Sequence, residues 1–384
     1  MTVAVLFPRY DHPAIEERYA SWQAQMLLRR NGAKLHFYDP EEPASFAVGP
    51  VESSHVLVIT DPLLVPPAHL AERLLEALNA SAGAQAALPV TNESANDRQR
   101  TTPLAPYMTL RELQLVTGQM QDRPAALQRV KWDVADPGAY LCASSMLDNV
   151  DDSPRRALAG REVVISANDY AHRWSSLRGQ VRYDLLELIS KDAKSVLEFG
   201  CGEAPLGEAL KKRQPVRVVG VELDQKAAAI ARKRIDDVYC ADVREIVNII
   251  EEQFDWIVGG DIVEHLDEPW SFLSDLRNVC KSGGRLLLSL PNISNASIVN
   301  DLLQGRFDYV YMGLTCVGHL RFFTKQTIEE MLTIAGWKVD AILPQQPMAT
   351  PPRDELLAAL DAAGIAYKKD DLIAPGYYVI ARNP

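Results

Sequence analysis

The chain has 384 residues, which is more than one hydrophobic core usually serves, so its length predicts two domains. Its composition, 47% hydrophobic and 24% charged, is that of an ordinary globular protein. The formal charge of -11 argues against an extended nucleic-acid surface or an anionic-membrane surface, because both partners require clustered lysine and arginine.

Localisation is predicted from the cysteines and from the start of the chain. The five cysteines are widely spread and form no Cys-x-x-Cys pair, which is typical of reduced thiols in a cytosolic protein. The first residues lack a basic segment and their apolar run stops at Pro8, so no signal peptide is expected. No stretch approaches the roughly 20 apolar residues of a membrane span. We therefore expect a soluble, cytoplasmic protein without a membrane span. The sequence does not predict its oligomeric state.

Residues 1–150 predict a separate α/β domain, because strand-like and helix-like segments alternate there. The predicted strands are 3–7, 35–38, 55–59 and 138–142, and the predicted helices are 15–30 and 68–80. Such alternation is typical of a mainly parallel sheet. The charged, proline-bearing sequence that follows predicts a linker, which we place at residues 151–164.

The second predicted domain extends from residue 165 to residue 384. A helix over Tyr170–Ser190 is expected to lead into a strand that ends at Phe199. Six more strands alternate with helices, and an insertion at about 344–375 precedes the last strand. These six predicted strands are 216–222, 238–240, 256–259, 285–290, 338–343 and 377–381.

A glycine-rich turn at the end of the first of these strands is the most informative motif. Glu198 closes an apolar strand, and Gly200 and Gly202 follow it before small residues enter a helix. Glycines at such a bend let a ligand lie directly on the backbone, although NAD, FAD and phosphate sites share this pattern. Glu222 ends the next strand 20 residues after Gly202, the spacing at which an acid meets ribose hydroxyls. Asp242, after the following strand, places an acceptor where an adenine amino group would lie.

Together with the segments Asp261–Leu266 and Lys281–Gly284, this ordered series resembles the class I S-adenosylmethionine-dependent methyltransferases over residues 165–384. The resemblance implies an α/β protein whose seven-stranded Rossmann-like sheet is preceded by a separate α/β domain, with S-adenosylmethionine as cofactor. It also implies a set of cofactor-binding residues for the methionine end, the ribose and the adenine: Glu198, Gly200, Gly202, Glu222, Asp242, Val243 and Asp261.

The turn departs from the usual pattern at two positions. Ala204 stands where relatives carry a third glycine, and Pro205 follows it. Alanine is commonly tolerated at that position, whereas the proline leaves the shape of the loop open. Cys201, inside the turn, is interpreted as a small residue that fits the bend rather than as a nucleophile.

Candidate catalytic bases are few, because the second domain contains only three histidines, His172, His265 and His319. The stretch from 313 to 324, which contains His319, is similar to a segment of bacterial methyltransferases associated with sugars and cell-surface glycans. Methyl transfer to a hydroxyl requires removal of its proton, so His319, His265 and Glu264 are the catalytic candidates. A structural hydrogen-bonding role for His319 is equally open.

The Asp-x-x-Glu-His run at 261–265, followed by His319, also resembles metal-dependent O-methyltransferases of the quinone-biosynthesis and small-RNA types. That resemblance implies a divalent cation bound by Asp261, Glu264, His265 and His319. The alternative is that Glu264 and His265 only line the acceptor pocket. Four more residues are candidates for the lining of that pocket: Asn292, Phe307, Tyr309 and Tyr311. The alternative is that these residues pack in the core or in a lid.

The first domain resembles a glycosyltransferase-type nucleotide-sugar domain. Its strand at 56–61 reaches Asp61, where such enzymes place metal-binding carboxylates. Pro62 follows, so the usual Asp-x-Asp pair is missing. A non-catalytic accessory domain is therefore favoured over an active transferase.

These observations predict an S-adenosylmethionine-dependent methyltransferase. Its expected partner is a small-molecule or glycan acceptor, O-methylated on a sugar, a glycan or another small hydroxylated molecule. Two alternatives stay open: a bifunctional glycan enzyme with an active N-terminal glycosyltransferase, and a protein that binds S-adenosylmethionine without turnover.

Overall fold

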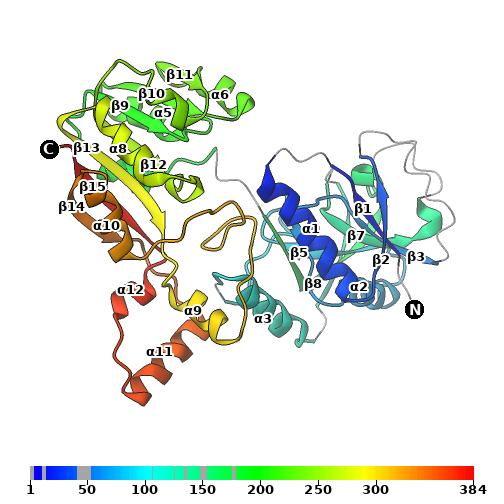
Figure 1. The fold of residues 1–384 in the computed structure, drawn as a ribbon. Helices are drawn as coiled ribbons and strands as arrows, with labels where there is room; N and C mark the ends of the chain where they lie inside the picture. The colour runs from blue at the N-terminus through cyan, green and yellow to red at the C-terminus, as the bar shows by residue number, and fades with distance from the viewer. Residues whose placement is uncertain are drawn as a thin grey trace. The chain divides into compact units, whose positions relative to one another are not determined.

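The computed structural model describes the chain at residues 4–10, 14–40, 53–105, 107–124, 126–133, 136–147, 154–174 and 179–384. The chain divides into two compact units, each with its own sheet (Figure 1). Unit 1 comprises Met1–Ser175 and Asp308–Val317, and unit 2 comprises Ser176–Phe307 and Gly318–Pro384. Among the described residues, no helix is both long enough and apolar enough to cross a membrane.

Unit 1 is built on a mixed sheet with the strand order β2-β1-β3-β7-β5-β8-β4, and β6 also pairs with β8. Its strands are β1 (Ala4–Pro8), β2 (Lys34–Tyr38), β3 (His55–Ile59), β4 (Leu64–Val65), β5 (Ala86–Thr91), β6 (Leu127–Lys131), β7 (Ala139–Ala143) and β8 (Glu162–Arg173). Its helices are α1 (Ile15–Arg30), α2 (Leu70–Asn79) and α3 (Leu110–Gln121). The expectation of a mainly parallel sheet is wrong, because β7 runs antiparallel between β3 and β5, and β4 and β6 run antiparallel to β8.

Helix α1 shows how the sequence specifies an element of unit 1. Its buried positions include Ala20, Ala24, Leu27 and Leu28, which lie three and four residues apart and so share one helix face. Acids occupy the first turn and arginines the last, an arrangement that complements the helix dipole. The predicted bounds, 15–30, are those of the structure.

Strand β8 departs most from the sequence prediction. Tyr170, expected to begin a helix, lies in this strand and is fully buried. Pairing with β5 on one side and with β6 and β4 on the other side fixes these residues in the sheet of unit 1. The helix expected over 170–190 is reduced to α4 (Tyr183–Leu188), and the compact unit extends beyond the predicted boundary at 164. Residues 151–153 of the predicted linker lie outside the described residues.

Unit 2 contains the predicted seven-stranded sheet, in the order β11-β10-β9-β12-β13-β15-β14. The strands are β9 (Ser195–Phe199), β10 (Arg217–Glu222), β11 (Asp237–Cys240), β12 (Phe254–Gly260), β13 (Cys280–Pro291), β14 (Lys338–Pro344) and β15 (Gly376–Arg382). The first five are parallel, and β15 runs antiparallel to both of its neighbours. All seven strands therefore occur where the sequence predicted them, within a few residues at each end.

Helices pack on both faces of this sheet because residues alternate in orientation along each strand. Leu197 and Phe199 belong to a core cluster on one face, whereas Val196 belongs to the cluster on the other face. A Cβ atom at Gly259 would lie 2.0 Å from the ring of Phe199, so a side chain on β12 is excluded at that point. The described helices of unit 2 are α4, α5 (Pro205–Arg213), α6 (Gln225–Ala231), α7 (Val243–Ile246), α8 (Pro269–Asp275), α9 (Ala296–Leu303), α10 (Lys325–Ile334), α11 (Pro351–Ala363) and α12 (Lys369–Ile373).

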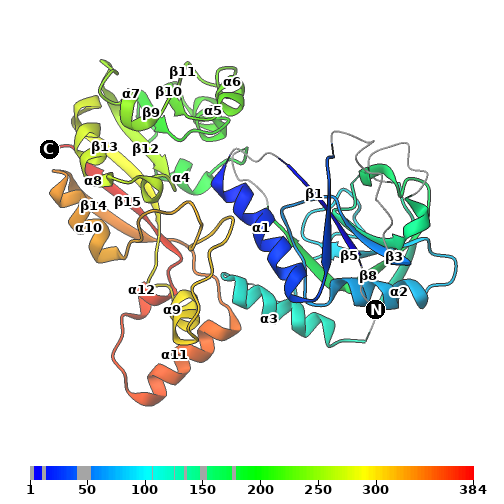
Figure 2. The same ribbon diagram turned by 45° about the vertical axis from the view of Figure 1, so that its right-hand side comes forward.

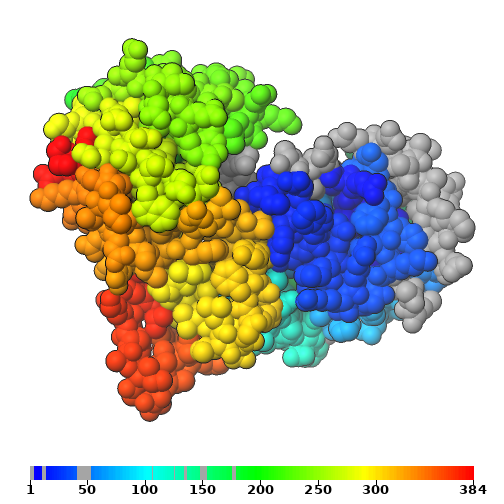
Figure 3. All heavy atoms as spheres, in the orientation of Figure 1, coloured from blue at the N-terminus to red at the C-terminus, as the bar shows by residue number. Residues whose placement is uncertain are grey.

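The segment between β14 and β15 forms an arm that carries α11 and α12. Helix α11 lies beside α9 (Figure 2), and the side chains of Ser297 and Thr350 are in hydrogen-bond contact where the two elements meet. In Figure 3 the residues of α11, coloured orange-red, form a projection at the lower end of unit 2. This segment lies at the position of the expected insertion.

Candidate active site

The glycine turn occupies the carboxyl end of β9, at the centre of the sheet of unit 2. Gly200 and Gly202 have φ angles of 68° and 56°, a backbone region that side chains disfavour. A Cβ atom at Gly200 would also lie 2.3 Å from the side chain of Ile262. Both glycines are therefore required by the backbone path of the turn, which lies at the edge where open α/β sheets bind nucleotides.

The two unusual residues of the turn have separate explanations. Ala204 adopts the left-handed region, with φ 57°, at the position where a glycine is usual. Pro205 is the first residue of α5, where the missing N–H removes no helical hydrogen bond and the fixed φ suits the helix. The proline therefore begins the helix without distorting it.

Glu222 connects β10 to the glycine turn. Its carboxylate accepts hydrogen bonds of 2.8 Å from the backbone N–H of Gly202 and of 2.8 Å from that of Asp224. These bonds fix the carboxylate beside the turn and leave lone pairs on both oxygens for a ligand. This geometry is what a carboxylate that accepts from two ribose hydroxyls requires.

Glu198 lies in β9 just before the turn, and its side chain is buried. Burial raises the pKa of its carboxyl to about 8, the nearby charge of Glu222 adds to this, and a hydrogen bond from the Gly207 backbone opposes it. A Cβ atom at Gly207 would lie 3.3 Å from Oε2 of Glu198, so the helix that follows packs directly against this acid. Cys201 is also buried, and burial raises the pKa of its thiol, which is the environment of an inert packing residue.

Asp242 follows β11 and is the N-cap of α7, which begins at Val243. Both of its carboxylate oxygens accept from the guanidinium group of Arg244, and the Arg244 side-chain hydrogen bonds are the main cause that lowers the pKa of Asp242. The structure thus places Asp242 at a strand end and gives it an arginine partner that sequence reasoning did not identify. Its contact with adenine stays a prediction.

Asp261 follows β12 and has a φ angle of 55°. Its carboxylate accepts a hydrogen bond of 2.6 Å from Arg182 and another from the hydroxyl of Ser289 on β13. Arg182, immediately before α4, also pairs with Asp184. Sequence reasoning missed Arg182, since it lies 79 residues from Asp261 and belongs to no motif.

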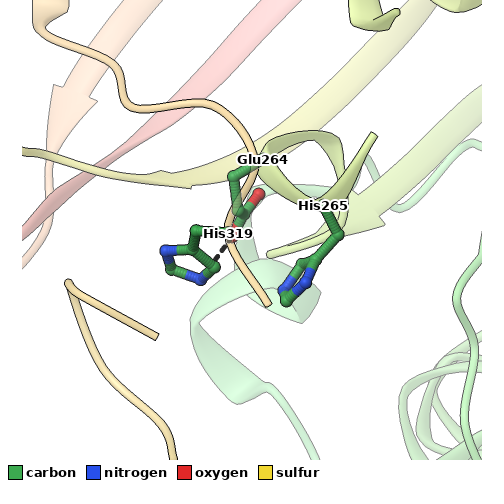
Figure 4. Close-up of side chains that lie close together, drawn as sticks. All are labelled: Glu264, His265 and His319. Atoms are coloured by element: carbon green, nitrogen blue, oxygen red, sulfur yellow. Dashed lines mark ion pairs between the residues drawn. The ribbon is translucent and has the colours of Figure 1, made fainter. Parts of the chain in front are cut away.

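A second cluster lies beside the end of β12 and consists of Glu264, His265 and His319 (Figure 4). Glu264 and His265 belong to the short 3-10 helix Val263–His265, whereas His319 comes from the loop before α10. Backbone N–H groups of Leu320 and Arg321 both donate to the carbonyl of Glu264, at 2.8 Å and 3.0 Å. These two bonds hold the distant segment against the 3-10 helix.

The side chains of this cluster face one another. The rings of His265 and His319 meet edge to face at 4.8 Å between centroids, and Nε2 of His319 lies 3.8 Å from Oε1 of Glu264. Glu264 is fully buried, and neither carboxylate oxygen has a hydrogen-bond donor among the described residues. Burial, with the charge of Asp261 as a second cause, raises the pKa of Glu264 well above its usual range. A buried carboxylate in this state binds a proton or a neighbouring positive charge.

Of the four predicted metal ligands, the structure brings together three, with ligand atoms within 4.8 Å of one another. Asp261 is not in this group, because Arg182 and Ser289 already bind its carboxylate. The resemblance to a four-ligand site therefore extends only to Glu264, His265 and His319.

The aromatic residues expected to line one acceptor pocket belong to two different units. Tyr309 and Tyr311 lie in the 308–317 segment of unit 1. The ring of Tyr309 meets that of Tyr19 edge to face, and the ring of Tyr311 lies tilted against that of Trp174. Phe307 packs on Phe322 in unit 2.

Asn292, the fourth of these candidates, is fully buried at the end of β13. Its amide donates to the carbonyls of Asp371 and Ala374, at 2.6 Å and 2.9 Å. This side chain therefore fastens the arm that carries α11 and α12 to the sheet.

Unit 2 thus has the architecture of an α/β domain that binds a nucleotide-like cofactor, with a glycine turn and acids at the carboxyl ends of the strands of a seven-stranded sheet. Residues 170–342 match the family described as a methyltransferase domain. The chain carries a class I S-adenosylmethionine-dependent methyltransferase domain and is an enzyme of that family. The family implies S-adenosylmethionine as cofactor.

Sequence similarity to curated methyltransferases supports this assignment. The chain is 27% identical over 183 residues to the ubiquinone biosynthesis O-methyltransferase of Coxiella burnetii (strain Dugway 5J108-111), a match that covers 41% of this chain and 77% of that protein. It is 33% identical over 126 residues to the ribosomal protein L11 methyltransferase of Pseudoalteromonas atlantica, covering 32% of this chain and 42% of that protein. A solved S-adenosylmethionine-dependent methyltransferase from Archaeoglobus fulgidus aligns with 50% of this chain and 87% of its own, at 19% identity and a TM-score of 0.38.

Proposed function

We propose that this methyltransferase transfers the methyl group of S-adenosylmethionine to a hydroxyl group of a small acceptor, with sugars and glycans among the candidates. The observation that supports a hydroxyl acceptor is the buried pairing of His319 with Glu264 beside the end of β12. An amine that arrives neutral needs no base, whereas a hydroxyl must lose its proton during transfer. The relative named for O-methylation in ubiquinone biosynthesis supports the same acceptor atom.

The cofactor roles follow from the strand ends of unit 2. We assign the methionine end to the turn formed by Glu198, Gly200 and Gly202, and the ribose hydroxyls to Glu222. The adenine is assigned to Asp242 and the backbone of Val243, with Asp261 as a further cofactor residue.

The reaction is an in-line displacement at the methyl carbon. S-adenosylmethionine, held by the residues assigned above, would supply the methyl group: the acceptor oxygen would bond to the methyl carbon as the carbon–sulfur bond breaks, and the sulfur would keep the electron pair in neutral S-adenosylhomocysteine. The hydroxyl proton passes to the imidazole of His319, and the charge of the resulting imidazolium is balanced by Glu264 at 3.8 Å. Most of the remaining rate enhancement comes from alignment of donor and acceptor and from exclusion of water.

One observation favours a metal-assisted form of the same function. Glu264 offers a buried carboxylate without a hydrogen-bond donor among the described residues, and two imidazoles lie beside it, a donor set that fits a divalent transition metal. The residues that would hold the cation are Glu264, His265 and His319. A cation bound there would lower the pKa of the acceptor hydroxyl, so that His319 would act as a ligand instead of a base.

The experiment that tests the proposal is a product screen on the full chain. S-adenosylmethionine is incubated with phenols, free sugars and glycans, with and without EDTA, and methylated products and S-adenosylhomocysteine are detected by mass spectrometry. Methyl ethers that persist in EDTA support the His319 base, and methyl ethers lost in EDTA and restored by added metal support the metal-assisted form. Only N-methylated products, or no S-adenosylhomocysteine from any acceptor, would contradict the proposal.

A matched pair of variants separates the chemistry from the fold. His319→Ala removes the proposed base, and His36→Ala removes a histidine of strand β2 in unit 1, far from the cluster in sequence and in another sheet. The proposal requires product formation to fall in the first variant and to persist in the second, at equal S-adenosylmethionine affinity.

A further inference from the structure

Unit 1 contains a cavity that the methyl-transfer site does not use. The cavity has a volume of ≈ 620 Å³, which lies in the range of sites for small ligands, about 300–1,000 Å³. Its lining comes from Asp61 after β3, from Asn92 and Glu93 after β5, from Arg173 at the end of β8, and from the turn that leads into β7. All of these residues belong to unit 1.

The position of the cavity follows from the direction of the strands. Strands β3 and β5 are both antiparallel to β7, and β8 is parallel to β5, so the carboxyl ends of β3, β5 and β8 meet at one edge of the sheet. In open α/β sheets, ligands bind outside the carboxyl ends of the strands. The cavity of unit 1 lies at that edge.

Hydrogen bonds hold the polar side chains of the cavity in fixed positions. Asp61 is buried and accepts from the backbone N–H of Leu63 and from the guanidinium of Arg173, which also donates to Glu93 at 3.0 Å. The side chain of Asn92 pairs with both backbone groups of Arg173, at 2.7 Å and 3.0 Å. These contacts order the polar groups without a ligand, which reduces the entropy lost on binding.

A second set of hydrogen bonds orders other residues of the lining, Asp136 and Gln99. Asp136 accepts from the hydroxyl of Thr60 and from the backbone N–H of Gly138, at 2.7 Å and 2.9 Å. The buried amide of Gln99 donates to the carbonyls of Pro89 and Pro137, at 3.0 Å and 2.9 Å. The cavity is therefore lined by residues that are far apart in sequence and joined by hydrogen bonds.

We propose that this cavity binds a neutral saccharide. Carboxylates accept hydrogen bonds from sugar hydroxyls, while guanidinium and amide groups donate to them, and both kinds of group line the cavity. The lining carries three carboxylates, Asp61, Glu93 and Asp136, against two guanidinium groups, Arg100 and Arg173. Arg173 is already paired with two of those acids, so the balance of charge favours an uncharged ligand over an anion.

The same charges disfavour a sugar nucleotide in this cavity. A diphosphate beside these carboxylates requires a divalent cation to offset the repulsion. Among the residues that the structure describes, the one cluster of three or more metal-ligating side chains is Glu264, His265 and His319, in unit 2. The proposed site is thus for the saccharide itself and is independent of the methyl-transfer reaction.

Saturation-transfer NMR on the full chain tests this proposal. The probes are glucose, galactose, mannose, rhamnose and N-acetylglucosamine with their methyl glycosides, and UDP-glucose and GDP-mannose with and without Mg²⁺. We expect signal transfer to the protons of at least one neutral sugar. Transfer to none of the neutral sugars, or transfer only to the nucleotide sugars in Mg²⁺, would overturn the proposal.

Three variants locate the binding. Ala95→Trp places a large ring among the residues that line the cavity, and Ala80→Trp makes the same change at an exposed position after α2. Glu93→Gln keeps the size of the side chain and removes its charge, and we expect it to weaken sugar binding about tenfold, the loss of one charge-assisted hydrogen bond. The proposal requires loss of transfer in Ala95→Trp, with the fold checked by circular dichroism, and full transfer in Ala80→Trp. Unchanged binding in both Ala95→Trp and Glu93→Gln would place the sugar elsewhere and overturn the assignment.

Discussion

The two units place polar residues at the same edge of an α/β sheet, but they build the site by different means. In unit 2, backbone conformation forms the site: Gly200 and Gly202 take positive φ angles, and the amide of Gly202 donates to the carboxylate of Glu222. In unit 1, side chains form it, because Arg173 joins Asp61 to Glu93 across the ends of three strands. A site formed by the backbone suits a cofactor that lies close to the chain. A site formed by polar side chains suits a ligand that is recognised through its hydroxyl groups. Variants in each unit test this difference.

The largest effect is expected for His319→Ala in unit 2. Loss of a general base lowers turnover by about 10²–10⁴-fold, while S-adenosylmethionine affinity should not change because the cofactor residues lie elsewhere. Turnover of the acceptor identified in the product screen and calorimetry with S-adenosylmethionine measure the two quantities. A loss of cofactor affinity equal to the loss of turnover would mean that His319 supports the cofactor site instead.

A smaller effect is expected for Glu222→Ala. The variant removes the carboxylate that anchors Gly202 and that we propose accepts from the ribose, so cofactor affinity should fall by about 1–3 kcal/mol. Glu329→Ala, an exposed acid on α10, serves as the control. If calorimetry gives equal affinities for the two variants, the ribose does not lie at Glu222.

In unit 1 the matching change is Arg173→Gln, which removes the side chain that joins the acids of the cavity. Asp61 is buried and loses its charged donor, so the free energy of unfolding of unit 1 should fall by about 1–3 kcal/mol. Thermal unfolding measures the loss, with Arg18→Gln on the exposed side of α1 as the control. S-adenosylmethionine affinity should stay at the level of the unmodified protein, and a large fall would contradict the independence of the two sites.

A further expected effect is a pH dependence of the free energy of unfolding, caused by Glu198. The pKa of this buried acid is raised to about 8, so between its unfolded pKa of about 4.3 and 8 the folded chain binds a proton that the unfolded chain releases. Stability is greatest below the unfolded pKa and falls as pH rises, by at most about 1.4 kcal/mol per pH unit. Glu198→Gln should abolish this contribution, so its melting temperature relative to the unmodified chain should rise from pH 5 to pH 8. The exposed Glu251→Gln should show no such trend.

The position of the glycine turn beside Glu222 was predictable because these residues form short motifs at fixed spacings. Gly200, Gly202 and Glu222 lie within two adjacent strands and their turns, and parallel pairing brings the strand ends together. The cluster of Glu264 and His319 was predictable only through family resemblance, since 55 residues separate the two in the sequence. Arg182 was not predictable, because nothing in its neighbourhood distinguishes it from other surface arginines.

Unit 1 was harder to predict for a physical reason. Strand β8 is buried on both faces over most of its length and carries aromatic residues, so its periodicity does not differ clearly from that of a buried helix. The antiparallel strand β7 enters between β3 and β5 from later in the chain, a crossing that no local pattern specifies. The cavity that results depends on pairings such as Asp61 with Arg173, which lie 112 residues apart.

The segment 308–317 determines how unit 1 and unit 2 can be expressed as separate proteins. The chain leaves unit 2 at residue 307, contributes to unit 1, and returns at residue 318, one residue before His319. In unit 1 the segment is fastened by the amide of Gln23, which donates to the carbonyl of Tyr309 at 2.9 Å, and by packing of Tyr311 near Trp174. A single cut after residue 175 would therefore remove Val310, part of the core of unit 1, from the N-terminal fragment. It would leave the C-terminal fragment with a loop that has lost its packing partners, next to His319. Clean separation requires two further junctions: a short polar linker in place of 308–317 in the catalytic fragment, and the same ten residues fused to the end of the N-terminal fragment.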